Sequence, residues 1–140
     1  MVLDLFSRRV VGWSMADNMK SQLVMNALVM ALGNRSRLGH LMHHSDRGSQ
    51  YASYDFQGLL SRHDIECSMS RKGECYDNAV VESFFGTLKS ELVHRDSYRT
   101  RAEAKKAIHD YIEIYYNRKR RHSTLGYSSP AQFERDHVAA

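Results

Sequence analysis

Apolar and polar residues follow one another along the chain in a pattern that predicts alternating strands and helices. Short runs rich in β-branched and aromatic residues predict strands, and apolar residues recurring every three or four positions predict helices. In chain order the pattern predicts a hairpin over residues 1–15, a helix over 21–33, a strand over 37–45, a helix over 51–64, a strand over 65–70, a helix over 78–93 and a helix over 101–117. This order favours an α/β fold in which helices flank a mixed sheet.

Local signals predict some helix ends and helix faces. Ser21 is a candidate cap for the first helix, and Gly33 is expected to end it. The expected core-facing stripe of the helix over 78–93 consists of Val81, Phe85, Leu88 and Leu92. The corresponding stripe of the helix over 101–117 consists of Ala107, Ile108, Tyr111, Ile112 and Tyr115.

Length and composition limit the classes of protein to consider. A chain of 140 residues with 42% apolar and 26% charged residues is typical of one globular domain with a single core. It contains no apolar run of about 18 residues, so we expect no membrane span. Cys67 and Cys75 are too few for a disulfide framework or a zinc site of cysteines, and we expect two reduced thiols in a cytosolic protein.

The net charge of +4 is unevenly distributed along the chain. Residues 99–121 contain eight Lys or Arg and three Asp or Glu, which gives this segment a balance of +5. A basic zone confined to one segment is typical of a protein that binds a polyanion, most commonly nucleic acid. A solvated helix face is the alternative that charge alone leaves open.

Asp46 lies between an apolar segment and a predicted helix, in the stretch HHSDRGSQY. A lone Asp in that position often caps the helix that follows. The carboxyl ends of strands are also where α/β proteins gather ligands and catalytic groups. Asp46 therefore has two interpretations, a helix cap or part of a ligand site.

The predicted helix over 78–93 carries polar residues beside its apolar stripe. Seven residues bring a helix back to within roughly 20° of its starting direction and advance it by about 10 Å. One face is therefore expected to contain Asn78, Glu82, Gly86 and Lys89. Glycine in a helix interior costs roughly 1 kcal/mol relative to alanine, and the close approach of a ligand would explain Gly86. A Glu and a Lys that merely face solvent are the alternative.

Two carboxylates on neighbouring elements suit Mg²⁺ or Mn²⁺, which prefer oxygen ligands. Asp46 and Glu82 are the candidates. Two such ions about 3.5–4 Å apart can activate an attacking hydroxyl and stabilise the leaving oxygen of a phosphoryl transfer. Zinc bound by His43, His44 and Asp46 is a weaker alternative, because adjacent residues of a strand point to opposite faces.

Four motifs in order resemble bacterial insertion-sequence transposases of the DDE type, relatives of retroviral integrases. The motifs are LDLFSRRVVGWSM, HHSDRGSQY, SRKGECYDNAVVESFFGTLKSEL and YNRKRRHSTLGYSSPAQFE. The resemblance implies a ribonuclease-H-like integrase core over residues 1–140, ending in a basic helical segment from about 99 to 140. Asp46 and Glu82 have 35 residues between them, as the second and third catalytic acids of that family do. Lys89 matches its DNA-contacting basic position.

The same resemblance implies an Asp, Asp and Glu triad that binds two divalent metal ions. The family cuts the ends of its element and joins the freed 3′-hydroxyls to target DNA. Its first acid precedes the LDLFSR segment, so we expect that acid to be absent from this chain, which would be an N-terminally truncated core of weak activity. Asp4 stands where the family orders the hairpin turn, and we do not expect it to replace the missing ligand.

A non-enzymatic DNA-binding or regulatory fragment of a transposase is the second hypothesis. The run Arg118, Lys119, Arg120 and Arg121 would contact phosphates, and Tyr115 and Tyr116 would stack on bases. A ribonuclease-H-like nuclease that cuts without joining is a third. The resemblance further implies a homo-oligomer when full length, and a bacterial cytoplasmic protein associated with the nucleoid when bound to DNA.

Overall fold

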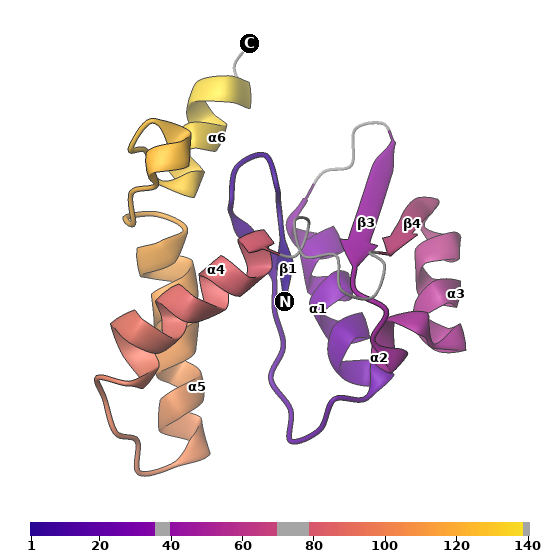
Figure 1. Cartoon of the computed structure of the whole chain (residues 1–140), viewed down its shortest axis with the longest axis horizontal. Helices are drawn as coiled ribbons and strands as arrows, with labels where there is room; N and C mark the ends of the chain where they lie inside the picture. Colours follow the sequence, from indigo (N-terminus) through magenta and orange to yellow (C-terminus); the bar gives the residue numbers. More distant parts are fainter. Residues whose placement is uncertain (36–39, 70–78, 139–140) are drawn as a thin grey trace. The chain divides into compact units, whose positions relative to one another are not determined.

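The computed structural model describes residues 1–35, 40–69 and 79–138, and these form a mixed α/β structure of helices and small sheets (Figure 1). The strands are β1 (Val2–Leu3), β2 (Val10–Gly12), β3 (Leu41–Ser45) and β4 (Ile65–Met69). The α-helices are α1 (Ser21–Asn34), α2 (Ser49–Ala52), α3 (Tyr54–Arg62), α4 (Ala79–Leu88), α5 (Arg101–Asp110) and α6 (Pro130–Val138). The π-helical segments η1 (Lys89–Val93) and η2 (Tyr111–Tyr116) continue α4 and α5, and η3 (Ser123–Leu125) is a 3₁₀ turn.

The strands of the described residues form two separate two-stranded sheets, β1–β2 and β3–β4, in place of the single mixed sheet that the sequence predicts. Hydrophobic periodicity identifies a strand and its buried face, but it does not say which strand lies beside which. β3 and β4 are parallel, with Leu41 opposite Ile65 and Ser45 opposite Met69. The strands and the predicted hairpin of β1 and β2 therefore agree with the prediction, whereas a single sheet of all the predicted strands is not found among the described residues.

The chain divides into two compact units. The first unit comprises Met1–Val2 and Val11–Glu82, and the second comprises Leu3–Val10 and Ser83–Ala140. The core of the first unit is made by apolar residues of α1, α3 and β4, namely Val24, Leu28, Phe56, Leu59, Leu60 and Ile65. Burial of these side chains is what joins the two helices to the strand, at roughly 25 cal/mol per Å² of apolar surface.

Two predicted helix boundaries of the first unit are wrong. Lys20 occupies the N-cap position of α1 without a side-chain hydrogen bond, and Gly33 lies inside the helix, which ends at Asn34.

The helix predicted over 51–64 is two helices, α2 and α3. They are separated at Ser53, whose Oγ accepts a hydrogen bond of 3.2 Å from the Phe56 N–H and so begins a new helix.

The core of the second unit lies between α4 and the helix formed by α5 and η2. Its buried residues include Phe84, Leu88, Tyr111, Ile112 and Tyr116. The rings of Phe84 and Tyr116 meet edge to face with centroids 4.8 Å apart, which is a favoured aromatic geometry. Phe85, predicted to face the core, is 40% exposed, and Phe84 takes its place.

The predicted stripe of the second long helix is wrong at one position. Tyr115 is 42% exposed and Tyr116 is 4% exposed, whereas the α-helical spacing places Tyr115 inside. The reason is the π-helical segment η2, in which hydrogen bonds join residues five apart. The wider turn brings Tyr116, five residues after Tyr111, onto the buried face.

The C-terminal helix α6 is an element that the hydrophobic pattern did not predict. Pro130 is its first residue, where a missing N–H is harmless and the fixed φ favours the helix. The Ser129 Oγ accepts a hydrogen bond of 3.2 Å from the Gln132 N–H. A Ser-Pro pair followed by a polar helix was the available signal. None of the helices in the described part of the chain has the length and apolar character that a membrane span requires.

Candidate metal and nucleic-acid site

Asp46 follows β3 directly and is exposed. Its Oδ1 accepts a hydrogen bond of 2.7 Å from the Gly48 N–H, which closes a tight turn before α2. Gly48, and not Asp46, occupies the N-cap position of α2, so the interpretation of Asp46 as a helix cap is wrong. Within the described residues, no hydrogen bond or ion pair engages Oδ2, whereas Oδ1 holds the turn in place.

The two histidines before Asp46 lie on opposite faces of β3, as strand geometry predicts. The His43 ring lies edge-on to Phe56 with centroids 5.3 Å apart, on the face that packs against the helices. His44 points the other way, where its Nδ1 lies 2.9 Å from the Ser68 Oγ of β4. This arrangement does not favour one ion bound by both histidines.

Burial sets the protonation of His43. It lowers the pKa of the imidazole from 6.5 to about 4, with smaller contributions from His44 and the N-terminal ammonium. Its Nδ1 is buried and has no hydrogen-bond partner among the described residues. His43 is therefore a neutral, partly buried residue at neutral pH.

Glu82 lies in the first turn of α4 and is exposed. Gly86 and Lys89 are also exposed, as their predicted position on one polar face requires. A Cβ added to Gly86 would meet no heavy atom of the described residues within 4 Å, so packing against this part of the chain does not require a glycine there. Asn78, expected on the same face, lies outside the described residues.

The donor chemistry of Asp46 and Glu82 fits a hard divalent cation, because both offer carboxylate oxygens at exposed positions. Both belong to the first unit, of which Glu82 is the last residue. The described residues contain no group of three or more His, Cys, Asp or Glu that could hold a metal ion. A complete coordination shell would thus need oxygens beyond these two, from nucleic-acid phosphates, water or other residues.

Asp4 performs the structural role expected of it. Its Oδ1 accepts hydrogen bonds from the Phe6 N–H at 2.8 Å and the Ser7 N–H at 3.2 Å. These bonds order the turn between β1 and β2. Of the two cysteines, Cys67 is a free, exposed thiol, and Cys75 lies outside the described residues.

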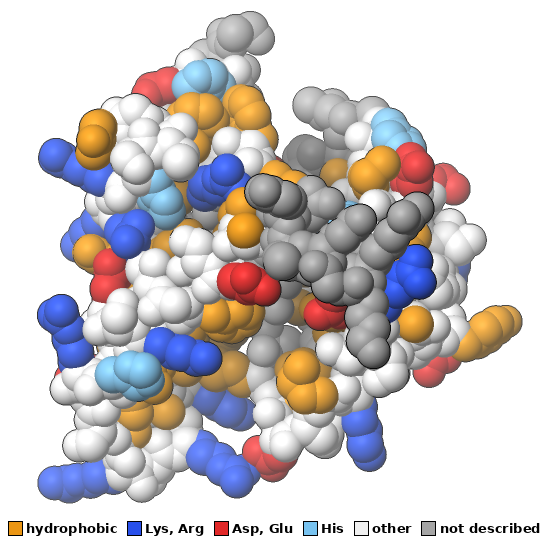
Figure 2. Space-filling view, viewed as in Figure 1, with side chains coloured by type: hydrophobic (Ala, Val, Ile, Leu, Met, Phe, Trp, Pro, Cys, Tyr) orange, Lys and Arg blue, Asp and Glu red, His pale blue; other side chains and the backbone are white. Residues whose placement is uncertain are grey.

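The basic run after η2 contains side chains in two different environments. Arg118, Lys119 and Arg121 are exposed, whereas Arg120 is partly buried and forms an ion pair with Glu91 at 3.0 Å. Tyr115 is exposed, but Tyr116 is buried, so the expectation that Tyr116 stacks on bases is wrong. On the face shown in Figure 2, several Lys and Arg side chains lie over elements of the second unit.

Comparison with known proteins identifies the family. Residues 1–75 match the model of one integrase core domain, and residues 82–138 match a second model of the same description. The chain belongs to the integrase core domain family. Integrase core residues thus include Asp46 in the first matched segment, and Glu82 opens the second.

The relatives of this integrase core chain are insertion-sequence transposases. It is 50% identical over 138 residues to "Transposase InsF for insertion sequence IS3fB" from Escherichia coli (strain K12), an alignment that covers 99% of this chain and 48% of the relative. It is 48% identical over 133 residues to "Transposase for insertion sequence element IS904" from Lactococcus lactis subsp. lactis (strain IL1403), covering 95% of this chain and 53% of the relative. The chain therefore spans about half the length of the curated relatives it matches.

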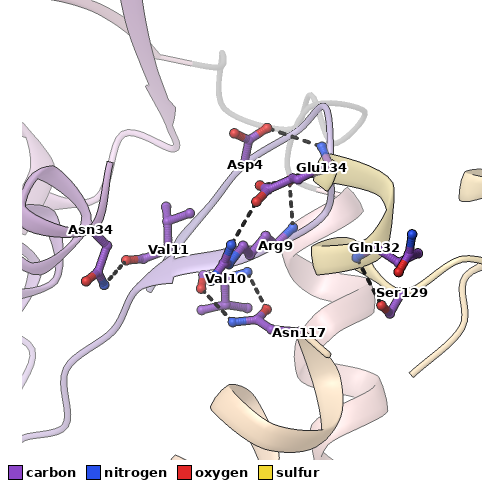
Figure 3. Close-up of polar contacts among 10 residues, drawn as sticks. Asp4, Arg9, Val10, Val11, Asn34, Asn117, Ser129, Gln132 and Glu134 are labelled. Atoms are coloured by element: carbon purple, nitrogen blue, oxygen red, sulfur yellow. Dashed lines mark hydrogen bonds and ion pairs between the residues drawn. The ribbon is translucent and has the colours of Figure 1, made fainter. Parts of the chain in front are cut away.

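Sequence reasoning did not identify three buried or partly buried polar residues of the second unit. Asn117 bonds the backbone of Val10, and Glu134 bonds the side chains of Ser7 and Arg9 (Figure 3). Glu91 bonds Tyr111 and Arg120. Each partner lies 20 or more residues away in the chain, so no local pattern predicts these contacts.

Proposed function

We propose that this chain is the part of a DDE transposase core that carries two of its metal-binding carboxylates, Asp46 and Glu82. The whole protein would cut the ends of its insertion sequence and join the freed 3′-hydroxyls to target DNA. The observation that carries this proposal is the position of Asp46, exposed directly after the parallel strand β3 and held by its own turn. The names of the similar transposases support it.

The fold that goes with this function is a ribonuclease-H-like integrase core, with the two units working as a single catalytic domain. The match to the integrase core domain supports this part of the proposal. Divalent ions, Mg²⁺ or Mn²⁺, would supply activation of the attacking hydroxyl and stabilisation of the leaving oxygen. Asp46 and Glu82 would hold them through carboxylate oxygens.

DNA is the proposed substrate, both as element ends and as target. Lys89 and Asn78 would contact DNA near the carboxylates, and the exposed cations of the run, Arg118, Lys119 and Arg121, would contact phosphates. Such contacts position the duplex without reading its sequence. We further propose that the full protein works as a homo-oligomer in the bacterial cytoplasm, on the nucleoid when bound to DNA.

A regulatory DNA-binding role is the second candidate. The exposure of three cations after η2 favours it, because these side chains can bind DNA whether or not the metal site is complete. A chain that binds DNA without catalysis could form mixed complexes with intact transposase. The two candidates differ in whether Asp46 and Glu82 are needed.

Mn²⁺ binding tests the metal-site proposal directly. We would titrate the chain with Mn²⁺ and follow the free ion by electron paramagnetic resonance, with and without a short duplex of an element end. Asp46→Asn and Glu82→Gln should each weaken Mn²⁺ binding at least tenfold, because each removes a charged oxygen ligand. Asp55→Asn, which removes an exposed carboxylate from α3, is the matched control and should bind as the wild type does.

A strand-transfer assay with the same variants separates the two candidate functions. Any Mn²⁺-dependent joining by the chain should disappear in Asp46→Asn and Glu82→Gln and persist in Asp55→Asn. Mn²⁺ binding that is unchanged in both site variants would overturn the metal-site proposal. DNA binding that survives in those variants would then leave the regulatory role as the better account.

A further inference from the structure

Glu91 holds together two helical segments of the second unit. Its Oε2 accepts a hydrogen bond of 2.7 Å from the Tyr111 hydroxyl. The Arg120 Nε donates to both carboxylate oxygens, at 3.0 Å to Oε1 and 3.2 Å to Oε2. The guanidinium of Arg120 also lies 5.9 Å from the centroid of the buried Tyr116 ring, within the range of a cation–π contact.

The hydrogen bonds of Glu91 are shielded from solvent and are kept over a wide pH range. The Tyr111 side chain is buried, and burial together with its bond to Glu91 raises the pKa of the phenol, so the hydroxyl stays a donor. Glu91 and Arg120 are both about 70% shielded from solvent, since their side chains are 30% and 26% exposed. Breaking such a pair by removing one partner leaves the other charge poorly solvated.

Both helices that meet at Glu91 are π-helical at the point of contact. Glu91 lies in η1 and Tyr111 lies in η2. π-helical turns are well under 1% of residues in proteins and are frequently found at functional sites. Two of them joined by one hydrogen bond indicate that the position of these side chains matters beyond ordinary packing.

Exposed cations flank the cluster on both helical segments. Arg120 is committed to Glu91, whereas its neighbours Arg118, Lys119 and Arg121 are exposed. Lys89, on η1, is also exposed and lies two residues before Glu91. Glu91 therefore connects the segment that carries Lys89 to the basic turn of residues 118–121.

We propose that Glu91 is a positioning residue for DNA binding, which acts through Arg120 to hold the basic turn at a fixed place relative to Lys89, so that both contact the same DNA duplex. This inference rests on the proposed binding of DNA. It also assigns Arg120 a role different from that of its neighbours. Arg120 pairs with Glu91, whereas Arg118, Lys119 and Arg121 contact DNA phosphates.

The proposal predicts an effect opposite in sign to simple electrostatics. Replacing Glu91 by Gln removes a negative charge beside a basic surface, which by itself would tighten DNA binding. If Glu91 instead positions the basic turn, Glu91→Gln releases Arg120 and weakens binding. Each lost phosphate contact also makes the negative slope of log K, the DNA association constant, against log salt less steep by about 0.9.

The test measures binding of a fluorescent element-end duplex by anisotropy, without divalent metal, over a series of salt concentrations. We expect Glu91→Gln to weaken binding about three- to tenfold, with a salt slope smaller by about 1. Arg120→Lys keeps the charge but loses the planar donor group, and it should weaken binding to a similar extent. Lys89→Gln alone should make the salt dependence of DNA binding less steep. The same substitution added to Glu91→Gln should have a smaller effect.

Two control variants make the same change of charge elsewhere in the second unit. Glu134→Gln breaks the Arg9–Glu134 pair, which measures 2.8 Å, and Asp96→Asn removes an exposed carboxylate. Both should bind DNA as tightly as the wild type or more tightly. Thermal unfolding of all variants, measured alongside, shows whether Glu91→Gln and Glu134→Gln lose comparable stability while only the former loses affinity.

Tighter binding by Glu91→Gln, matching the control variants, would overturn the positioning role and leave the proposed function intact. Undiminished binding by Arg120→Lys would overturn it as well, because lysine has a methylene group in place of the Nε–H that Arg120 donates to Glu91. A wild-type chain that fails to bind the duplex at all would overturn the proposed DNA binding together with this inference.

Discussion

Asn117 binds both backbone polar groups of Val10. Its Oδ1 accepts from the Val10 N–H at 2.9 Å, and its Nδ2 donates to the Val10 C=O at 3.0 Å (Figure 3). The amide thus makes the pair of hydrogen bonds that a neighbouring strand would make to β2. Asn117 is 1% exposed, and its own C=O accepts from the Ala131 N–H at 2.8 Å, so one residue joins the hairpin to the start of α6.

Asn117→Ala is expected to lower the free energy of unfolding by about 2–4 kcal/mol, because it leaves the buried N–H and C=O of Val10 unsatisfied. Asn117→Asp should be similarly harmful, since a carboxylate cannot donate to the Val10 C=O. Urea unfolding measures the effect. Asn26→Ala, at an exposed asparagine of α1, is the control and should change stability by less than about 0.5 kcal/mol. Equal stability of Asn117→Ala and the control would contradict the role of Asn117.

Gly12 is required by the close approach of β2 to α1. A Cβ at Gly12 would overlap the carbonyl oxygen of Ala27 and lie 2.8 Å from the Ala31 Cβ. Gly12→Ala should therefore cost about 1–3 kcal/mol of stability through overpacking. Gly58→Ala, in α3 with no neighbour within 4 Å of the added Cβ, is the matched control and should be neutral or stabilising in thermal unfolding. A stable Gly12→Ala protein would mean that β2 and α1 separate at little cost.

The Gly86→Ala variant is expected to change stability and DNA binding in opposite directions. Because the added Cβ of Gly86→Ala meets nothing within 4 Å, the free chain should gain about 0.5–1 kcal/mol from better helix propensity. If DNA approaches the backbone here, the same variant should bind the duplex more weakly in anisotropy titrations. Gly33→Ala, an open glycine in α1, should gain stability without changing DNA binding. Wild-type affinity in Gly86→Ala would show that the ligand does not come close to this turn.

His43 should make stability depend on pH below neutrality. Its folded-state pKa is lowered to about 4 from 6.5, chiefly by burial, so between these values the unfolded state binds a proton that the folded state does not. The stability is fully present above pH 6.5 and is lost progressively as the pH falls toward 4, and the loss amounts to about 3 kcal/mol. Urea unfolding at several pH values measures it. His43→Phe should flatten the curve in this window, and an unchanged pH dependence in that variant would exclude His43 as its source.

The helices and strands were largely predictable from the sequence, and their ends were not. The periods of apolar residues identified α1, β3, β4, α4 and α5 because each element buries one face. The break at Ser53 and the two π-helical segments escaped prediction, since a single capping bond or one widened turn barely alters the pattern. The same widened turn explains why Tyr116 is buried where Tyr115 was expected.

The residues of the candidate site were also predictable from the sequence, whereas their contacts were not. Sequence motifs predicted Asp46, Glu82, Lys89 and the basic run as candidate residues, because residue types and their spacing are local properties of the chain. They could not distinguish Arg120 from Arg118, Lys119 and Arg121, since that distinction depends on Glu91, 29 residues away. They also could not establish that the Asp46 carboxylate shapes its own turn through Gly48.

The sequence by itself determined the family, the chemical types of the candidate site and the burial of most apolar stripes, because these depend on residue identity and spacing. Only the tertiary structure decided how polar groups are paired: Asn117 with Val10, Glu134 with Ser7 and Arg9, and Glu91 with Tyr111 and Arg120. Burial makes an unpaired polar group costly, so each must find a partner. Which partner it finds depends on residues that the fold brings together from distant parts of the chain.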